Sequence, residues 1–406
     1  MINSCKIKIS RIILFVLLIV SLLMYLLCPK QMTVSMPLFY ATFGLAVISI
    51  AVFMINKKKT SYIDFDTLFI FVLFLISFLS TFFYGKSYFR ALFLGFEFNT
   101  DYINSGSLLS LIGIQSYCLG STKVHPSRYR QESKVQSITH KVIGTNGLFF
   151  CVLIGMVLFF LTGGWAYYQS IYKNGAGGDS LCVYILLITI VFAIVLVATE
   201  FYNSEIDHRY HISKYSVAVV CLFCFVLLYL GNRTAASNIL LPAIGLYALF
   251  KKRVSIKIFI VFMLIAIFSM WIFQNVRSNV EVESEKLSPI MIFTDLTIPS
   301  RTIYEAMDYV DDYGFTYGRT MAIGLVGVVP KLASILNMGE SGSAEVLTNE
   351  TYDKLHYRGS RTGLGTTVIS DIYLSFGLVG VVILMYLLGL FVSRSQKKAL
   401  QLNYYG

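Results

Sequence analysis

The sequence predicts an all-α polytopic integral membrane protein with about ten transmembrane helices and one large extracytoplasmic loop that contains short helices. Three observations support this fold class. The 406 residues are 56% hydrophobic and only 14% charged, with a mean hydropathy of +0.70, whereas a soluble domain carries roughly 25% charged residues. Apolar runs of roughly 17–25 residues, the length that crosses a bilayer, recur along the chain. The polar residues are concentrated in one long passage.

Ten apolar segments alternate with polar loops, and basic clusters such as Lys57-Lys58-Lys59 and Lys251-Lys252-Arg253 mark the cytoplasmic side. This alternation predicts that both termini are cytoplasmic. We expect the first segment to be a retained helix rather than a cleaved signal peptide. The predicted spans are Ile12–Cys28, Pro37–Ile55, Thr67–Tyr84, Ile103–Gly120, Val142–Thr162, Leu181–Phe201, Tyr215–Gly231, Ala235–Phe250, Ile258–Gln274 and Thr366–Val392.

The long polar passage lies between the ninth and tenth spans. Residues Arg277–Arg361 hold 12 of the 22 acidic residues and 8 of the 33 Lys and Arg residues, so their formal charge is −4 while the rest of the chain carries +15. Basic residues favour the cytoplasmic side of a membrane protein, so this loop is expected outside. The predicted divisions are therefore spans one to nine in 1–275, a periplasmic loop in 276–363, and the last span with a cytoplasmic tail in 364–406.

Three segments of this loop have distinct patterns. Arg301–Asp312 reads as a short amphipathic helix that places Ile303, Ala306, Met307 and Val310 on one face. Met321–Leu336 is apolar but short, so it is expected to lie in the membrane interface or to re-enter the membrane. Gly339–Gly365 is polar and rich in Gly and Ser, and is expected to be a mobile loop.

Arginine residues outside the membrane are the first candidates for a functional site. Arg233 lies in a predicted outer turn of three residues, where its charge marks either a site or a side chain that reaches lipid phosphate. Guanidinium groups bind phosphate through paired hydrogen bonds, so arginines in the outer loop indicate an anionic ligand. The alternative is that they neutralise the acids of the same loop. The loop arginines are Arg277, Arg301, Arg319, Arg358 and Arg361.

Asp371 and His356 are the candidate proton acceptors. Asp371 lies one turn into the last span, where its carboxylate is either a partner of the helix N-terminus or a base that faces a cavity. His356 is the one histidine of the outer loop and lies near two arginines, although an isolated loop histidine is most often a surface residue. No cluster of Cys and His has metal-ligand spacing, so neither a metal nor a cofactor is expected. Because the basic residues lie at helix ends, we expect membrane lipid and no nucleic acid as a partner.

The chain resembles the bacterial oligosaccharide repeat-unit polymerases, the O-antigen polymerase family of Wzy type, and the related ligases. The resemblance covers most of the chain in layout and a few short motifs in residues. It is carried by Gly231-Asn232-Arg233-Thr234, by Tyr317-Gly318-Arg319 leading to Val329-Pro330, and by Gly363-Leu364-Gly365-Thr366-Thr367 followed by Ser370-Asp371-Ile372-Tyr373-Leu374-Ser375-Phe376-Gly377. Family members often have Glu where this chain has Asp371, which keeps the acidic role and changes its reach.

The resemblance implies a metal-independent glycosyl transfer at the periplasmic face of the bacterial inner membrane. The donor would be a growing O-antigen or capsular glycan on undecaprenyl diphosphate, and the acceptor one lipid-linked repeat unit, with a chain-length regulator protein as a candidate partner. Aromatic residues between Phe93 and Tyr102 would line a lateral entrance for lipid, or simply lie at headgroup level. Asp371 would be the base with His356 in reserve, and the diphosphate would bind among Arg233, Arg301, Arg319 and Arg361, with Arg358 and Arg277 as further candidates.

Two alternative functions use the same layout. A ligase that passes the finished glycan to lipid A core would need the same arginines and the same topology. A flippase or other transporter of lipid-linked oligosaccharides would instead show internal repeats and charges along mid-membrane helices. The charges of this chain gather at the predicted outer face, which favours the enzyme.

Overall fold

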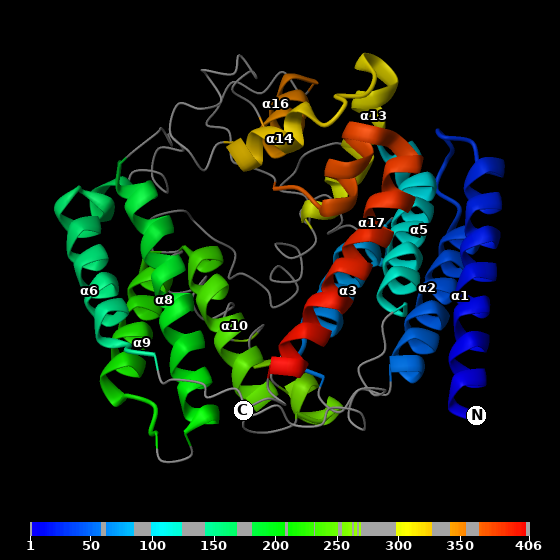
Figure 1. Cartoon of the computed structure of the whole chain (residues 1–406). Coiled ribbons are helices and arrows are strands. Elements are labelled where there is room, and N and C mark those ends of the chain that lie inside the picture. The colour runs from blue at the N-terminus through cyan, green and yellow to red at the C-terminus, as the bar shows by residue number, and fades with distance from the viewer. Residues whose placement is uncertain are drawn as a thin grey trace. The chain divides into compact units, whose positions relative to one another are not determined.

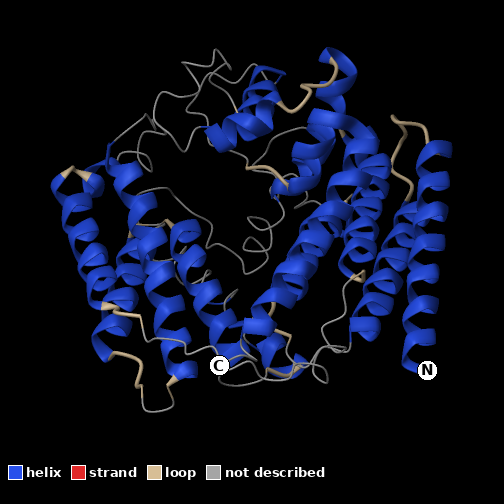
Figure 2. Cartoon of the chain, in the orientation of Figure 1, coloured by secondary structure: helices blue, strands red, loops and turns tan. Residues whose placement is uncertain are grey.

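Helices and the loops that join them make up the described part of the chain, with no strand among its residues (Figure 1, Figure 2). The structure is a computed structural model that describes residues 2–57, 62–84, 99–123, 143–168, 181–207, 210–230, 232–250, 254–261, 264–265, 268, 298–326, 342–354 and 365–402. The chain divides into two compact units. Unit 1 comprises Met1–Lys59, Asp66–Pro126 and Ile256–Lys397, and unit 2 comprises Thr60–Phe65, Ser127–Ser255 and Lys398–Gly406.

Most of the predicted spans correspond to apolar helices. Five described stretches are long and apolar enough to cross a membrane: Ile9–Leu27, Met36–Lys57, Phe65–Phe82, Leu181–Ser204 and Val368–Lys398. Three shorter apolar helices occupy Asn146–Leu161, Lys214–Tyr229 and Thr234–Ala248. These eight match eight of the ten predicted spans and bear out the all-α membrane class. Of the predicted ninth span, the structure describes residues 258–261, 264–265 and 268, all of them helical.

The predicted fourth span is a buried helix at the centre of unit 1. α5 (Ile103–Ser121) carries five serines together with Asn104 and Gln115, and every residue except Leu119 is buried. It packs against α1 (Ile2–Leu27) and α2 (Met36–Lys57). The Gln115 amide donates to the Ser49 hydroxyl of α2 at 3.1 Å. Because neighbouring helices cover it, this helix can carry polar side chains, some of which bond to α2 or to backbone carbonyls, as Ser105 and Ser110 do.

α5 also crosses α17 (Val368–Leu402) at a pair of glycines. A Cβ atom added to Gly120 would lie 2.0 Å from the carbonyl oxygen of Tyr386, and one added to Gly389 would lie 2.2 Å from the carbonyl oxygen of Tyr117. Each glycine therefore lets the other helix approach backbone to backbone. Small residues at such crossings are what allow close packing between membrane helices.

The end of unit 1 near Lys57 is held by a buried ion pair. The Lys57 ammonium, at the end of α2, lies 2.7 Å from Asp66 Oδ2 at the start of α3 (Phe65–Phe78), and both side chains are almost fully buried. The second carboxylate oxygen, Oδ1, accepts hydrogen bonds from the hydroxyls of Tyr117 at 2.7 Å and Ser121 at 2.9 Å, both on α5. Lys57 thus faces the protein interior instead of lipid headgroups, and this contact joins three helices.

The opposite end of unit 1 carries the short helices α13 (Arg301–Tyr313), α14 (Arg319–Val326) and α16 (Ser343–Lys354) (Figure 1). The predicted amphipathic helix is confirmed as α13, and its four predicted apolar positions are all buried. α14 covers the first part of the predicted interfacial segment, and residues 327–336 lie outside the described ranges. The expectation of a mobile loop at 339–365 was wrong for residues 343–354, which form α16.

Unit 2 is a bundle of α6 (Asn146–Leu161), α8 (Leu181–Ile206), α9 (Lys214–Tyr229) and α10 (Arg233–Phe250). The turn from α9 to α10 is as tight as predicted. Asn232 caps α10 because its Oδ1 accepts from the Ala235 amide at 3.1 Å, while its Nδ2 donates to the Tyr168 hydroxyl at 2.9 Å. Arg233 is consequently the first residue of α10, fixed at the helix N-terminus by the cap beside it.

We predict that removing one member of the buried ion pair destabilises unit 1. Asp66→Ala would leave Lys57 charged, buried and unpaired, which costs about 3–5 kcal/mol in comparable sites. Replacing both residues, as in Lys57→Met with Asp66→Leu, leaves no unpaired charge and should recover much of this loss. Thermal unfolding of the purified protein in detergent measures both effects. A wild-type melting temperature for Asp66→Ala would contradict a structural role for the pair.

Candidate active site

The first turn of α17 is tied together by hydroxyl groups. The Thr367 hydroxyl accepts from the Ser370 amide at 3.0 Å, and the Ser370 hydroxyl accepts from the Thr367 amide at 2.9 Å. This reciprocal arrangement satisfies two N–H groups that an α-helix leaves open at its start, in the manner of a capping box with Ser in place of Glu. The polar run Thr366-Thr367 therefore starts the helix that carries Asp371.

The Asp371 carboxylate is half-buried and is held from two sides. The Thr366 hydroxyl donates to Oδ1 at 2.6 Å. The hydroxyl of Ser343, the first residue of α16, also donates to the carboxylate. Asp371 lies in the first turn of α17, where a negative charge is favoured by the helix dipole. Asp371 thus lies at the helix N-terminus with two hydroxyl partners, and both of its predicted roles, as a partner of that N-terminus and as a base, remain predictions.

α17 is interrupted one and a half turns beyond Asp371. Gly377 has φ +64° and ψ −157°, which breaks the helix at this residue. The carbonyls of Leu374 and Ser375 accept hydrogen bonds from the amides of Thr316 and Tyr317 at 3.0 and 3.1 Å. A Cβ atom added to Gly377 would lie 2.8 Å from the ring of Phe315, so a side chain at this position would meet that ring. Segment 315–317 therefore fills the break, and two of the short motifs that carry the family resemblance meet here.

Arg319 begins α14 directly after this turn. Its amide donates to the Thr316 carbonyl at 3.0 Å, and the hydroxyls of Thr316 and Thr320 lie 3.1 Å apart. The Arg319 side chain is exposed. Of the predicted arginines whose side chains the structure describes, Arg319 is the one that is free to reach a ligand in solution.

Arg301 has a different environment, because it is fully buried at the start of α13. Its guanidinium faces Glu305, one turn along α13, and Tyr352 of α16. Burial lowers the pKa of Arg301 to about 10, although Glu305 and Tyr352 oppose this shift. Burial likewise raises the pKa of Glu305 to about 7 against the opposing effect of Arg301. The surroundings of Arg301 favour the alternative in which it neutralises an acid of the loop.

α13 is also anchored to the helices beneath it by hydroxyls. The Ser300 hydroxyl donates to the Ser80 hydroxyl at 3.0 Å, and the hydroxyls of Thr302 and Ser370 lie 3.1 Å apart. The second contact joins the first turn of α13 to the first turn of α17. Arg301 precedes Thr302 in the sequence and Asp371 follows Ser370, so their backbones are close at this contact. The Arg301 side chain itself lies in the contact between α13 and α16.

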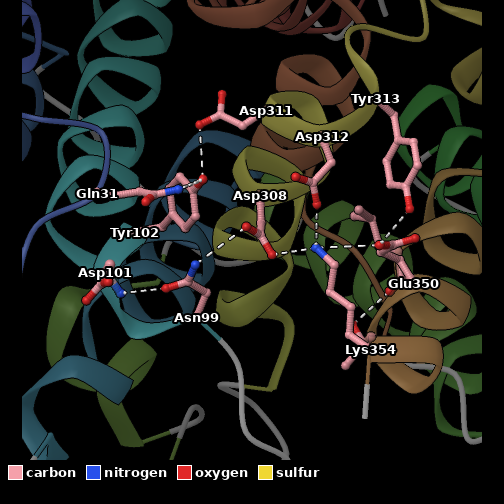
Figure 3. Close-up of polar contacts among 12 residues, drawn as sticks. Gln31, Asn99, Asp101, Tyr102, Asp308, Asp311, Asp312, Tyr313, Glu350 and Lys354 are labelled. Atoms are coloured by element: carbon pink, nitrogen blue, oxygen red, sulfur yellow. Dashed lines mark hydrogen bonds and ion pairs between the residues drawn. The ribbon is translucent and has the colours of Figure 1, made fainter. Parts of the chain in front are cut away.

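The acidic face of α13 is paired with two lysines, and the contacts of one of them, Lys354, are drawn in Figure 3. Lys354, at the end of α16, lies 2.6 Å from Asp308 and 3.0 Å from Asp312. On the other side, Asp311 lies 2.6 Å from the Lys30 ammonium and accepts from the Tyr102 hydroxyl at 3.0 Å. These acids raise the pKa of both lysines. Lysines thus pair with three of the loop acids, so these acids do not need Arg319 as a charge partner.

The remaining predicted site residues are distributed as follows. Arg233 begins α10 in unit 2, and the structure describes its backbone but not its side chain. Arg277, His356, Arg358 and Arg361 lie outside the described residues, as do residues 85–98 of the aromatic stretch. Within the described part of the chain there is no group of three or more His, Cys, Asp or Glu side chains that could hold a metal ion.

Sequence reasoning missed the contribution of α16 to the site. Its first residue contacts Asp371 and its last pairs with α13. A signal for this helix was present, because Glu345 lies in its first turn and Lys354 in its last, the charge order that a helix dipole favours. The Gly/Ser-rich surroundings concealed it.

Comparison with known proteins identifies one family. The model of a protein family described as "O-antigen polysaccharide polymerase Wzy" matches residues 9–405, which is nearly the whole chain. No curated protein and no solved structure matches the sequence.

We predict that the docking of α13 weakens as pH rises, because of Glu305. The folded state holds the proton of Glu305 up to about pH 7, whereas the ordinary pKa is 4.5. Stability is therefore fully present below pH 4.5 and falls by up to about 1.4 kcal/mol per unit between there and pH 7. Hydrogen-exchange protection factors of the α13 amides should fall over this range in wild type and stay level in Glu305→Gln.

Glu345→Gln serves as the control, since Glu345 is exposed on α16. It should reproduce the wild-type pH dependence. Protection of α13 that is independent of pH in the wild-type protein would contradict the assignment.

Proposed function

Because the chain belongs to the O-antigen polysaccharide polymerase Wzy family, we propose that it joins undecaprenyl-diphosphate-linked oligosaccharide repeat units into O-antigen or capsular polysaccharide. The reaction takes place at the periplasmic face of the bacterial inner membrane, and both termini are cytoplasmic. The distribution of charge supports this orientation, since the acidic loop is the one long passage of net negative charge in a basic chain. A chain-length regulator protein is a further proposed partner.

One observation supports the assignment of the site: an exposed arginine follows the turn that fills the break in α17, and a half-buried carboxylate lies in the helical segment before that break. Arg319 follows the turn whose amides bind the carbonyls of Leu374 and Ser375. Asp371 lies one helical turn before Ser375, about 6 Å along the axis. This pairing supports a site that receives both an anionic group and a hydroxyl.

The start of α17 adds a second favourable feature for an anion. The first turns of α13 and α16 contact it through Thr302 and Ser343, and α14 begins beside its break. The N-terminus of a helix carries a partial positive charge and open N–H groups, so it favours phosphate. The N-termini of α13, α14, α16 and α17 thus gather near the Asp371 carboxylate. This supports a diphosphate-binding region around Arg319.

The proposed reaction is a single displacement at the anomeric carbon of the donor glycan. The acceptor hydroxyl oxygen forms a bond to this carbon while the bond to the diphosphate oxygen breaks, and the electron pair leaves with the diphosphate. Asp371 takes the hydroxyl proton. In this proposal arginine side chains, and not a metal ion, stabilise the charge on the departing diphosphate, with Arg319 first and Arg233, Arg277, Arg358 and Arg361 as further candidates. One displacement inverts the anomeric configuration.

Thr366, Ser343 and Arg301 act through other residues in this proposal. The two hydroxyls orient the Asp371 carboxylate. Arg301 positions α13 against α16, because its side chain is buried beside Glu305 and Tyr352. His356 remains a candidate reserve base.

We predict that Asp371→Ala, Arg319→Ala and Arg233→Ala abolish long polysaccharide chains while the protein level stays normal. Loss of a general base lowers the rate roughly 10²- to 10⁴-fold, and loss of a charge-stabilising group lowers it about 10²- to 10³-fold. Arg319→Lys should restore only part, because an ammonium cannot replace the two parallel hydrogen bonds of a guanidinium. Gel profiles of the cell-surface glycan and a turnover assay with the purified protein measure these effects.

Arg394→Ala is the matched control, since Arg394 is an exposed arginine near the other end of α17. It should leave chain length unchanged. Full activity in Arg319→Ala would remove that residue from the site.

We predict that deleting the gene leaves single repeat units attached to lipid A core. A polymerase is needed only for elongation, so transfer of one unit to the core continues without it. A ligase mutant would instead carry no glycan on the core. Mass analysis of the lipopolysaccharide distinguishes the two outcomes. A core without any glycan would contradict the proposal that the protein is a polymerase.

A further inference from the structure

The described residue with the least ordinary backbone is Tyr317. It is the one non-glycine residue of the described chain with a positive φ, at +50°. This left-handed conformation is unfavourable for a residue with a Cβ atom, and Gly or Asn usually occupies it. Its side chain is nevertheless 80% exposed, so packing does not explain why a tyrosine stands here.

The position of the ring is fixed by the turn that carries it. The Tyr317 amide donates to the Ser375 carbonyl at 3.1 Å. The flanking amides donate as well, that of Thr316 to the Leu374 carbonyl and that of Arg319 to the Thr316 carbonyl. The ring meets Phe315 edge to face, with 6.4 Å between the centroids. These bonds fix the backbone of Tyr317, and the contact with Phe315 is the one described ring contact of its side chain. A binding residue whose backbone is already in place loses less freedom when a ligand binds.

The backbone of Tyr317 is linked to the segments that carry the two groups of the proposed reaction. Ser375, its hydrogen-bond partner, is one helical turn from Asp371, and Arg319 is two residues along the chain. The C–H bonds on one face of a pyranose ring form a flat apolar surface, while its hydroxyls point to the rim. A tyrosine offers the matching shape, with an apolar face and a polar hydroxyl at its edge.

We propose that Tyr317 is the platform against which a pyranose ring of the lipid-linked glycan packs, beside Asp371 and Arg319. This inference rests on the proposed function and identifies a binding residue of the same site. Strained residues that persist at exposed positions gather at functional sites, which is the relation seen here. An interfacial tyrosine that only contacts lipid headgroups has no need of a left-handed backbone.

The test compares variants of the full-length protein in lipid nanodiscs. The substrate is the lipid-linked repeat unit extracted from the source bacterium after deletion of this gene. Tyr317→Phe and Tyr317→Trp keep a ring and should hold KM within a few-fold of wild type. Tyr317→Leu and Tyr317→Gly remove it and should raise KM on the order of 10-fold, with a smaller change in kcat.

Two of these variants separate binding from folding. Leucine is as strained at φ +50° as tyrosine, whereas glycine relieves the strain and should leave the melting temperature equal to or above that of wild type. Tyr313→Leu is the control, because Tyr313 is also largely exposed and lies at the end of α13; its KM should not change. An unchanged KM in Tyr317→Gly, or a loss in Tyr317→Phe equal to that in Tyr317→Leu, would overturn the proposal.

A binding measurement distinguishes this inference from the proposed function. The water-soluble repeat-unit oligosaccharide, released from its lipid, is titrated into wild type and Tyr317→Gly without any turnover. Weaker binding by Tyr317→Gly supports the platform even if the wild-type protein never polymerises, in which case the proposed function fails alone. Equal binding by the two proteins overturns the platform and leaves the polymerase proposal in place.

Discussion

The architecture of unit 1 depends on how the interrupted backbone of α17 is satisfied. A carbonyl at the end of a helical segment has no N–H group four residues ahead, and such a group is costly when it is buried in an apolar environment. The amides of Thr316 and Tyr317 supply the missing donors to Leu374 and Ser375. Because this contact is made by the loop that follows α13, one local requirement of a membrane helix determines where α13, α14 and Arg319 lie.

The charges of the loop are divided between lysine and arginine according to their chemistry. The ammonium groups of Lys30 and Lys354 form ion pairs with the acids of α13, each acting as a point charge. The two described loop arginines differ in their surroundings, since Arg301 is buried beside Glu305 and Arg319 is exposed at a helix N-terminus. Arg301 has Glu305 four residues ahead, whereas Arg319 has no acid within four residues on either side. A count of charges over the whole loop does not show this difference.

Much of the fold was predictable because its signals are local. Apolar length predicted the spans, and the spacing of Ile303, Ala306, Met307 and Val310 predicted the buried face of α13. The burial of α5 was only hinted at, since its length is that of a membrane span while its serines, Asn104 and Gln115 make it more polar than the other spans. The Gly377 break and the Ser343 contact depend on segments that are 60 and 28 positions away in the sequence, so no local pattern carries them.

For the candidate site, too, the sequence indicated single residues but not the contacts between distant segments. The short motifs of the resemblance were recognised in the sequence, but the contact between two of them is made by backbone hydrogen bonds that any residue except proline can donate. Arg301 and Arg319 were both predicted to bind the diphosphate, and burial separates them.

The glycine crossing of α5 and α17 has a mechanical consequence. Gly389 lies twelve residues beyond the break, so the half of α17 that follows Gly377 is locked to its neighbour backbone against backbone. The half that bears Asp371 is held by the core residues Ile369, Ile372 and Leu374, by hydroxyl contacts in its first turn and by the amides of Thr316 and Tyr317. Each half of α17 is therefore attached to unit 1 by its own kind of contact, so a substitution that loosens one half leaves the anchor of the other intact.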